Sequence, residues 1–382
     1  MKSLHTMLIA ILLIVAMPFF LFCDKEKNPI ESQEKVVRYP EAEAQNMDSA
    51  VLEELVDEVK AGTYGDVHSL LIQRNDVMVL EEYFGENTKN TIHPIYSATK
   101  SVTSALIGIA IHQGKLSGID EKMLKFFPEY EGAIGNLDSM KEAITIKNLL
   151  NMTAGFTWDE VSTSMYDSQN DVYKLQMSSD WIKYVLDLPM SDYPGSKFTY
   201  CCGATTLLSG ILQKATGQTA ADYAKTHLLE PLGIDQFDWS SERWGAGEIS
   251  NTAWGLDMRP ADMIKFGQLY LNNGRWNETQ IVPEEWVQTS TAQSVKDIES
   301  ASQFNATQKC DYAYQWWRFS DDHAVAGMID PNDAYFAFGH GDQAIWVVPH
   351  LNLVAAMTSG NYDTYKAYPL FWTYVLKSVK DK

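Results

Sequence analysis

Strand-like segments occur near both ends of this chain, and helix-like segments fill the middle. Residues 67–86, VHSLLIQRNDVMVLEEYFGE, read as a hairpin that turns at residues 74–76. The later part of the chain again predicts strands, at residues 311–320, 335–341, 343–349 and 351–359. This order predicts an α/β (α+β) fold in which one antiparallel sheet is built from both termini, flanked by helices, with an inserted helical subdomain.

The helical signals lie mainly between the two groups of strands. Residues 46–62 read as an amphipathic helix that Asp48 caps and Gly62 ends. Further apolar-striped segments predict helices at residues 145–155, 178–189, 203–217, 219–233, 259–274 and, at the end of the chain, 365–379. We therefore expect the inserted helical region to span roughly residues 105–290, and a cleft between it and the sheet is the natural place for a site.

The first 23 residues have the pattern of an export signal. Lys2 supplies a positive end, and residues 7–22 form an apolar stretch about as long as a signal core. Leu-Phe-Cys is similar to a bacterial lipoprotein cleavage site with Cys23 as the lipidated residue, although that site usually has a small residue in place of Phe22. An uncleaved N-terminal anchor and conventional secretion are the alternatives. All three predict an exported protein, periplasmic or on the outer surface, and the first two attach it to the membrane.

The rest of the chain divides into a linker and one domain. Residues 24–45 read as a polar linker, and residues 46–382 as the folded domain. A net charge of −20 argues against nucleic-acid binding, because phosphate contact needs clustered lysine and arginine side chains. The sequence thus predicts a folded domain whose partners are not nucleic acids.

The cysteines and histidines do not suggest a metal site. Cys201, Cys202 and Cys310 remain once Cys23 is assigned to the N-terminal segment, and they show no C-x-x-C spacing. We expect buried free thiols, with a bridge from Cys310 to Cys201 or Cys202 as the alternative in an oxidising compartment. The eight histidines lack the spacing of metal ligands. The sequence therefore predicts no metal and no other cofactor.

The segment PIYSATKSVTSALIGIAI (residues 94–111) places Ser97 and Lys100 three residues apart at the start of an apolar helix. This spacing puts both side chains on one helix face, so the amine can reach the hydroxyl. A serine hydroxyl is a weak nucleophile near neutral pH and needs such a base. Burial disfavours the ammonium form of Lys100, and the positive helix N-terminus favours an oxyanion at Ser97. Taken alone, S-x-x-K also occurs by chance at solvated helix starts.

Two further segments contain candidate site residues. Tyr200 follows a Pro-Gly turn in YPGSKFTYCC, and its hydroxyl or tyrosinate can pass a proton to a leaving group. His340, in FGHGDQ, is expected at a strand edge, where it can bind a substrate carboxylate or assist proton movement. The backbone N–H of Gln343 would face the cleft and form an oxyanion hole with the N–H of Ser97. In isolation, the same residues also fit a core tyrosine and a surface histidine.

In this order, the three segments resemble the motifs of the serine β-lactamase and penicillin-binding-protein superfamily, which are S-x-x-K, Y-x-N and K-T-G or H-x-G. YSATKSVTSALIGIAIHQGKL, IKNLLNMTAGF and MRPADMIKFGQLYLNNGRW look like segments of its class C β-lactamase-related branch. That branch includes family VIII carboxylesterases, D-aminopeptidases, D,D-carboxypeptidases and 6-aminohexanoate-dimer hydrolases. The resemblance extends from about residue 50 to the C-terminus. It implies the serine-hydrolase fold and an acyl-enzyme on Ser97.

Two positions depart from these motifs. Cys202 stands where Y-x-N has asparagine, and a thiol is a poorer partner than an amide for a lysine or a substrate amide. Asp342 follows His340 and Gly341 where the third motif usually ends in glycine, and a carboxylate in the cleft would repel anionic substrates unless His340 is protonated. Residues 157–160, TWDE, add either an acidic rim or a solvated loop. These departures weaken the β-lactamase interpretation more than the esterase interpretation.

The sequence therefore predicts an exported serine hydrolase that cleaves an ester or amide bond in a small-molecule or peptide-like substrate. Ser97 is the predicted nucleophile, Lys100 its base and Tyr200 the proton relay. A D,D-carboxypeptidase or β-lactamase that acts on cell-wall peptides or β-lactams is one alternative. A non-catalytic protein that binds a cell-wall fragment is another.

Overall fold

The computed structural model describes the chain over residues 38–239, 249–292, 295–298, 310–362 and 364–381. The predicted export signal, including Cys23, lies outside these residues. Among the helices that are described, none is both long enough and apolar enough to cross a membrane. Export and lipidation therefore stay predictions from the sequence.

The folded domain begins earlier than the sequence suggests. A short helix, α1 (Pro40–Ala44), occupies the end of the segment 24–45 that is predicted to be a linker. Tyr39 and Ala42 are buried in the hydrophobic core. All the described residues belong to one compact unit. The folded domain thus includes residues 39–44, which the sequence predicts to be part of the linker.

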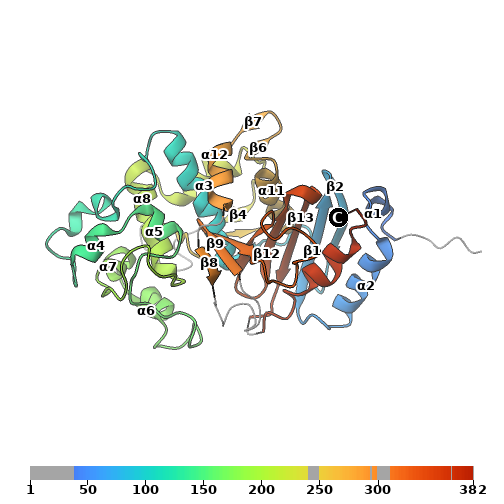
Figure 1. The fold of residues 1–382 in the computed structure, drawn as a ribbon, viewed down its shortest axis with the longest axis horizontal. Coiled ribbons are helices and arrows are strands. Elements are labelled where there is room, and N and C mark those ends of the chain that lie inside the picture. The colour runs from blue at the N-terminus through green and yellow to red at the C-terminus, as the bar shows by residue number, and fades with distance from the viewer. Residues whose placement is uncertain (1–37, 240–248, 293–294, 299–309, 363, 382) are drawn as a thin grey trace, which may run out of the picture. The chain divides into compact units, whose positions relative to one another are not determined.

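One eight-stranded sheet contains strands from both ends of the chain (Figure 1). The strands lie in the order β2-β1-β13-β12-β11-β10-β9-β8, and all the pairs are antiparallel. Their bounds are β1 (Val67–Arg74), β2 (Val77–Tyr83), β8 (Val295–Ile298), β9 (Cys310–Ala313), β10 (Trp316–Phe319), β11 (Tyr335–Gly339), β12 (Gln343–Val348) and β13 (Leu353–Ser359). The N-terminal hairpin pairs with the last strand, with Leu71 opposite Ala356. The predicted sheet built from both termini is confirmed.

Two hairpin turns are made by residues in the left-handed backbone region. Asn75 and Asp76 join β1 to β2 with φ of 49° and 63°, as the predicted hairpin requires. The segment 311–320 forms two strands rather than one, because Tyr314 and Gln315 turn the chain between β9 and β10 with φ of 30° and 72°. No Gly, Asn or Asp marks this second turn, so the sequence pattern does not reveal it.

The helices between the two groups of strands gather mainly at one end of the molecule, on the left in Figure 1. They are α3 (Thr99–His112), α4 (Ser139–Ala143), α5 (Ile146–Leu150), α6 (Asp171–Met177), α7 (Trp181–Leu186), α8 (Cys202–Thr216), α9 (Ala220–Ala224), α11 (Pro260–Leu271) and α12 (Glu284–Thr291). Short helical turns are η1 (Tyr96–Ala98), η2 (Met123–Phe126), η3 (Pro128–Tyr130), η4 (Lys225–Leu229), η5 (Pro349–Leu351) and η6 (Phe371–Leu376), the last within the predicted terminal helix. The remaining short strands are β3 (His93–Pro94), β4 (Phe237–Asp238), β5 (Asp257–Met258), β6 (Arg275–Trp276) and β7 (Thr279–Gln280). The N-terminal helix α2 (Ser49–Lys60) is capped as predicted, since the Asp48 side chain accepts from the Ala50 N–H at 2.9 Å.

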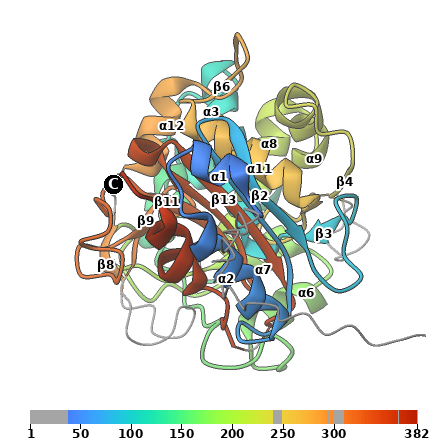
Figure 2. The ribbon, with the colours of Figure 1, turned by 90° about the vertical axis from the view of Figure 1, so that its right-hand side faces the viewer.

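The sheet is covered on both faces. Neighbouring residues of a strand point to opposite faces, and in β12 both Ile345 and Trp346 are fully buried. Ile345 faces α11, where Gly267 leaves room for it, and Trp346 stacks on Phe371 of η6 with ring centroids 4.8 Å apart. Figure 2 shows α2 and the terminal helix side by side on one face of the sheet. Coverage of both faces explains why β11, β12 and β13 are buried along their whole length.

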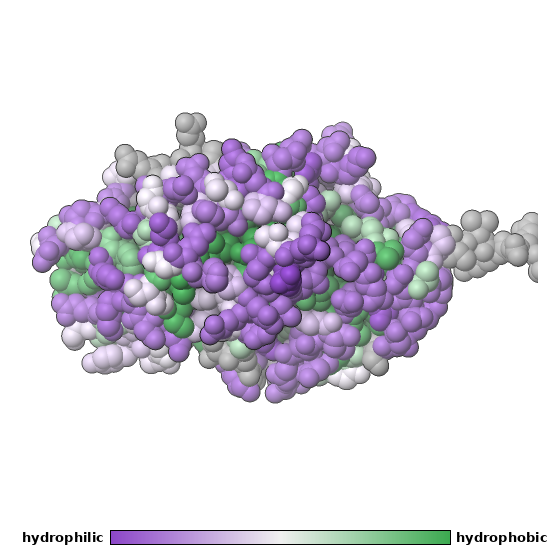
Figure 3. Space-filling model, turned by 90° about the horizontal axis from the view of Figure 1, so that it is seen from above, coloured by the Kyte–Doolittle hydropathy of each residue, from purple (hydrophilic) through white to green (hydrophobic). Residues whose placement is uncertain are grey.

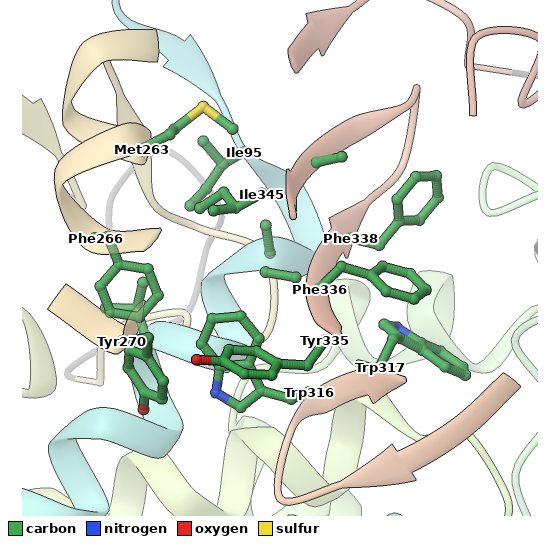
Figure 4. Packing of buried hydrophobic residues seen from close by; sticks show 14 of the residues in the cluster. Ile95, Met263, Phe266, Tyr270, Trp316, Trp317, Tyr335, Phe336, Phe338 and Ile345 are labelled. Carbon is green, nitrogen blue, oxygen red and sulfur yellow. The ribbon is translucent and has the colours of Figure 1, made fainter. Parts of the chain in front are cut away.

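Aromatic side chains fill the space between α11 and the sheet (Figure 4). The rings of Phe266 and Tyr270 lie 5.8 and 4.5 Å from that of Trp316 in β10. Trp316 in turn packs edge-on against Tyr335 of β11 at 5.3 Å. Although α11 falls within the segment 105–290 that is predicted as the helical insertion, it covers the sheet. Its packing fixes β10 and β11, which border the candidate site.

The visible surface is mostly hydrophilic, with hydrophobic residues showing near the middle of the view in Figure 3. Among the described residues, the large hydrophobic side chains that are exposed are Ile92, Leu137, Val161, Tyr166, Met177 and Tyr193. Val161 and Tyr166 belong to the wall of the cavity at the candidate site. Exposed apolar side chains around a cavity favour a site for an apolar part of a ligand.

Candidate active site

Ser97 lies in the helical turn η1, immediately before the buried helix α3. The preceding residue, Tyr96, has a φ of 45°, which is uncommon for a bulky side chain. Its ring is held edge-on against His340 and Tyr362, with centroids 5.6 and 5.8 Å away. A strained backbone of this kind persists where the surrounding structure fixes it. Here it brings the partly exposed Ser97 to the wall of a cavity.

Lys100 is buried in the first turn of α3 beside Ser97. Its Nζ lies 2.9 Å from Ser97 Oγ, 2.9 Å from the Ala253 carbonyl oxygen and 3.3 Å from Cys202 Sγ. A neutral amine has two hydrogens and one lone pair. If both hydrogens go to the carbonyl and the sulfur, the lone pair faces the Ser97 hydroxyl. The structure therefore brings the predicted nucleophile and base together in an arrangement that suits proton removal.

Tyr200 completes this group of side chains. It is hydrogen-bonded to Ser97, and its ring stacks on Trp317 at 5.6 Å while Lys100 Nζ lies 4.9 Å from the ring centroid. Burial raises the pKa of Tyr200 well above its ordinary value, and the nearby Cys202 and Glu160 raise it further. The hydrogen bond with Ser97 lowers the pKa, but its effect is smaller. The residue is therefore a neutral phenol rather than a tyrosinate. It can donate a proton to a leaving group.

Cys202, the first residue of α8, contacts both Lys100 and a carboxylate. Its N–H donates to Glu160 Oε2 at 2.7 Å, and its thiol lies 3.2 Å from Glu160 Oε1. Burial raises the pKa of the Cys202 thiol, as does the negative charge of Glu160, so the thiol keeps its proton. The S–H can then donate to Glu160 while the sulfur accepts from Lys100. Cys201 and Cys310 are likewise buried free thiols.

The third predicted segment reaches the site through the end of β11. A Cβ atom on Gly339 would lie 2.2 Å from the Ile95 carbonyl oxygen and 3.1 Å from Ser97 N, so only glycine allows this approach. Gly339 and His340 line the cavity. The main chain at residues 339–340 is thus the part of this segment that lies beside Ser97, where a second oxyanion donor is needed.

The structure does not place Gln343 at the cavity. The residue is fully buried at the start of β12, where it pairs with Gly339. Its side-chain amide donates to the carbonyl oxygens of Ser359 at 2.6 Å and Gly341 at 3.0 Å. Gln343 is not among the described lining residues, because the turn from β11 is short and Gln343 already belongs to the next strand. An oxyanion contact from its N–H stays a prediction from the sequence. The visible role of Gln343 is to fasten that turn to β13.

Asp342 also lies away from the cavity. It is fully buried, and its Oδ2 accepts from Asn361 Nδ2 at 3.0 Å and from the Ala367 N–H at 2.8 Å. Its φ of 65° and the φ of 81° at Gly341 form the turn before β12. Burial raises the pKa of Asp342 to about 6, although the two hydrogen bonds act to lower it. Its carboxylate therefore does not set the charge of the substrate pocket, contrary to one reading of the sequence.

A cavity of about 200 Å³ opens above Ser97. Its polar wall includes Glu160, Tyr200, Cys202 and His340. Its more apolar wall is formed by Tyr96, Val161, Met165, Tyr166, Val172, Trp254, Phe338 and Tyr365. Of the described residues that line it, none is a lysine or an arginine. This wall suits a neutral ligand better than one that carries a carboxylate.

Two contributors to the site carry little or no sequence signal. Glu160 was predicted only as part of an acidic rim or a solvated loop, yet its carboxylate accepts from Trp158 Nε1 at 2.6 Å and from Cys202. The Trp158–Glu160 spacing is the only local hint of that contact. Ala253 contributes a main-chain carbonyl to Lys100, and any residue could do so. Neither contact can be found without the fold.

This fold and this serine–lysine–tyrosine group define the class of serine β-lactamases and penicillin-binding proteins. The chain belongs to the β-lactamase family, whose family model, named Beta-lactamase, matches residues 52–369. This family consists of serine hydrolases, so the chain is placed among them. The resemblance of the sequence to this superfamily is thereby confirmed.

Three relatives illustrate the range of the family. The chain is 24% identical to Protein flp of Staphylococcus aureus (strain MW2) over 69% of its own length, and it spans about half of that relative (55%). It is 21% identical to the 6-aminohexanoate-dimer hydrolase of Paenarthrobacter ureafaciens over 76% of this chain and 72% of the relative. The structure of EstCE1, a hydrolase with promiscuous acyltransferase activity, is similar with a TM-score of 0.71 at 12% identity, over 89% of this chain and 99% of that one. That last likeness shows the fold alone.

Replacement of Tyr200 by phenylalanine tests its predicted part in proton transfer. We expect Tyr200→Phe to lower kcat for hydrolysis of a p-nitrophenyl ester by about 10²-fold or more, with KM changed only a few-fold. The ring and its stacking on Trp317 remain, so the melting temperature should be close to that of the wild type. Tyr312→Phe is the control, because it removes another buried hydroxyl next to this cluster. Equal losses in both variants would contradict the role of Tyr200.

Asp342 predicts a pH dependence of stability. Its pKa is about 6 in the folded protein and near its ordinary value of 3.8 when unfolded, so the folded state binds the proton more tightly between these values. The stability of the wild type should therefore fall as the pH rises from about 4 to about 6. An asparagine side chain cannot ionise, so the free energy of unfolding of the Asp342→Asn variant should not fall over this pH range. The free energy of unfolding of the variant, relative to that of the wild type, should therefore rise by roughly 2–3 kcal/mol between pH 4 and pH 7. Urea denaturation at several pH values measures this difference, and a constant difference would refute the assignment.

Proposed function

We propose that this protein is a serine hydrolase that cleaves the ester or amide bond of a neutral small-molecule or peptide-like substrate through an acyl-enzyme on Ser97. The observation that carries the proposal is the position of Lys100. Its Nζ lies 2.9 Å from Ser97 Oγ and has two further acceptors, so the neutral amine can give its two hydrogens to those acceptors and its lone pair to the Ser97 hydroxyl. A buried amine with this geometry is suited to act as a general base.

Acylation begins when Ser97 Oγ attacks the carbonyl carbon and Lys100 takes the hydroxyl proton. The resulting oxyanion accepts from the Ser97 N–H and from a main-chain N–H at the end of β11. When the tetrahedral intermediate collapses, the bond to the alcohol or amine breaks. Tyr200 donates a proton to that leaving group, and the Lys100 ammonium returns a proton to Tyr200.

Deacylation uses the same groups in reverse. A water molecule gives a proton to the Tyr200–Lys100 pair and attacks the acyl carbon. The Ser97 oxygen leaves and regains a proton from Lys100, and the acid is released. The net reaction adds one water across the ester or amide bond, and the enzyme returns to its starting protonation.

The cavity supports an esterase or amidase over a β-lactamase or D,D-peptidase. Those two classes act on substrates that carry a carboxylate, which needs a cationic partner. No lysine or arginine is present among the described lining residues, which include the carboxyl group of Glu160. The amide expected at Cys202 is also missing. The name of one relative, a 6-aminohexanoate-dimer hydrolase, agrees with the esterase or amidase proposal.

We also propose that the enzyme acts outside the cytoplasm. This part rests on the apolar stretch at residues 7–22 and on Cys23, which lie outside the described residues. Neither the fold nor the site depends on it.

Replacement of the nucleophile tests the proposed function. We expect Ser97→Ala to lower turnover of short p-nitrophenyl esters by at least about 10³-fold while the fold is retained. Ser101→Ala is the matched control, because Ser101 lies one turn further along α3 and donates to the Gln315 carbonyl at 2.7 Å, away from the cavity. It should keep most of the activity. Full activity of Ser97→Ala would disprove the mechanism.

The same purified protein separates the alternative functions. Turnover of esters without labelling by a fluorescent penicillin supports the esterase or amidase. Labelling by penicillin, or turnover of D-Ala peptides or cephalosporins, would favour the cell-wall enzymes instead. Absence of both turnover and labelling would favour a binding protein.

A further inference from the structure

Glu160 is the carboxyl neighbour of the Lys100–Cys202 contact, and it takes no part in the reaction steps proposed above. It lies at the cavity wall, and its carboxylate receives three hydrogen bonds. Oε2 accepts from the Cys202 N–H at 2.7 Å and from Trp158 Nε1 at 2.6 Å, and Oε1 lies 3.2 Å from the Cys202 sulfur. Two of these three contacts are with one residue. The carboxylate is therefore fixed relative to Cys202.

A thiol next to a catalytic lysine needs such a partner. The S–H bond rotates about Cβ–Sγ, so an isolated thiol can direct either its hydrogen or its lone pairs at the amine. Only the second orientation lets the sulfur accept from Lys100 at 3.3 Å. Glu160 accepts the thiol hydrogen on the other side of the sulfur. This leaves the sulfur lone pairs for the lysine.

The charge of Glu160 also acts on Lys100. Burial raises the pKa of Glu160, and the attraction of Lys100 lowers it, so the two groups interact electrostatically. The other titratable groups that face the pair are Tyr200, Cys201, Cys202 and Tyr312, and burial raises the pKa of each, so they stay neutral. The Cys202 thiol therefore keeps the hydrogen that it can donate to Glu160.

We propose that Glu160 is a positioning residue of the reaction: it orients the Cys202 thiol so that the sulfur accepts from Lys100 and the Lys100 lone pair faces Ser97. The pair Cys202 and Glu160 then does the work that a single amide does in the Y-x-N motif. This inference rests on the proposed function, because it assigns a role within that reaction.

A measurable effect follows from this role. The oriented thiol keeps the Lys100 lone pair towards Ser97, so loss of Glu160 should lower the rate of Ser97 labelling. This loss should depend on the thiol at position 202, whereas a residue that only stabilises the loop would lower the rate whatever side chain stands there.

The experiment measures the second-order rate of Ser97 labelling by a fluorophosphonate probe between pH 5 and pH 10. This readout needs no knowledge of the natural substrate. We expect Glu160→Gln to lower the rate on the alkaline plateau by about tenfold, because the thiol loses the partner that orients it. Glu160→Asp keeps a carboxyl group but shortens its reach to the Cys202 sulfur, so it should also lower the plateau.

A second background tests the link through sulfur. Cys202→Asn supplies an amide that can face Lys100 without help from Glu160. In that background, the further change Glu160→Gln should lower the plateau by less than about threefold. A tenfold loss in both backgrounds would overturn the proposal, because the effect would not pass through the thiol.

Asp159→Asn is the matched control on the same loop. Asp159 accepts from the N–H groups of Val161 and Ser162 and does not contact Cys202. Its profile should match that of the wild type, and melting temperatures check that each variant is folded. If the wild type is labelled at Ser97 and Glu160→Gln superimposes on it, this inference fails while the proposed function stands. If the wild type is not labelled at all, both fail.

Discussion

The contact between Lys100 and Ser97 is the interaction on which the rest of the site depends. A buried amine is costly unless its hydrogens have partners. α3 supplies the burial, and the Ala253 carbonyl and the Cys202 sulfur can accept the two hydrogens of the neutral amine. Both acceptors lie far from Lys100 in the sequence, so the amine is held only when the whole domain is packed. The position of the amine beside Ser97 therefore depends on the folding of the domain.

The two parts of the fold explain where the reacting groups meet. β11 brings a glycine, Gly339, against the segment that carries Ser97, and α8 begins at Cys202 beside Lys100. The sheet thus supplies the main chain around the nucleophile, and the helical region supplies the groups that handle protons. Loop residues such as Val161 and Tyr166 form the outer wall of the cavity. Changes in that wall can alter the substrate range without altering the nucleophile.

Much of this arrangement could be predicted because the signals are local. The S-x-x-K spacing, the Asp48 cap and the turn at Asn75 each depend on residues within a few positions of one another. The contacts that complete the site are not local, since Ala253 lies 153 residues from Lys100 and Glu160 lies 42 residues from Cys202. The contact at Ala253 is made by a main-chain carbonyl, which every residue type has, so the identity of the residue does not reveal it. The turn after β11 is equally hidden, because its length depends on how β11 and β12 pair.

The proposed mechanism requires Ser97 to carry the acyl group during turnover. Rapid quenching of the reaction with a p-nitrophenyl ester, followed by mass spectrometry of the intact protein and of its peptides, detects such an adduct. We expect the protein to gain the mass of one acyl group and the modified peptide to contain Ser97. An acyl group on another residue, such as Cys202, or turnover with no covalent adduct would contradict the mechanism.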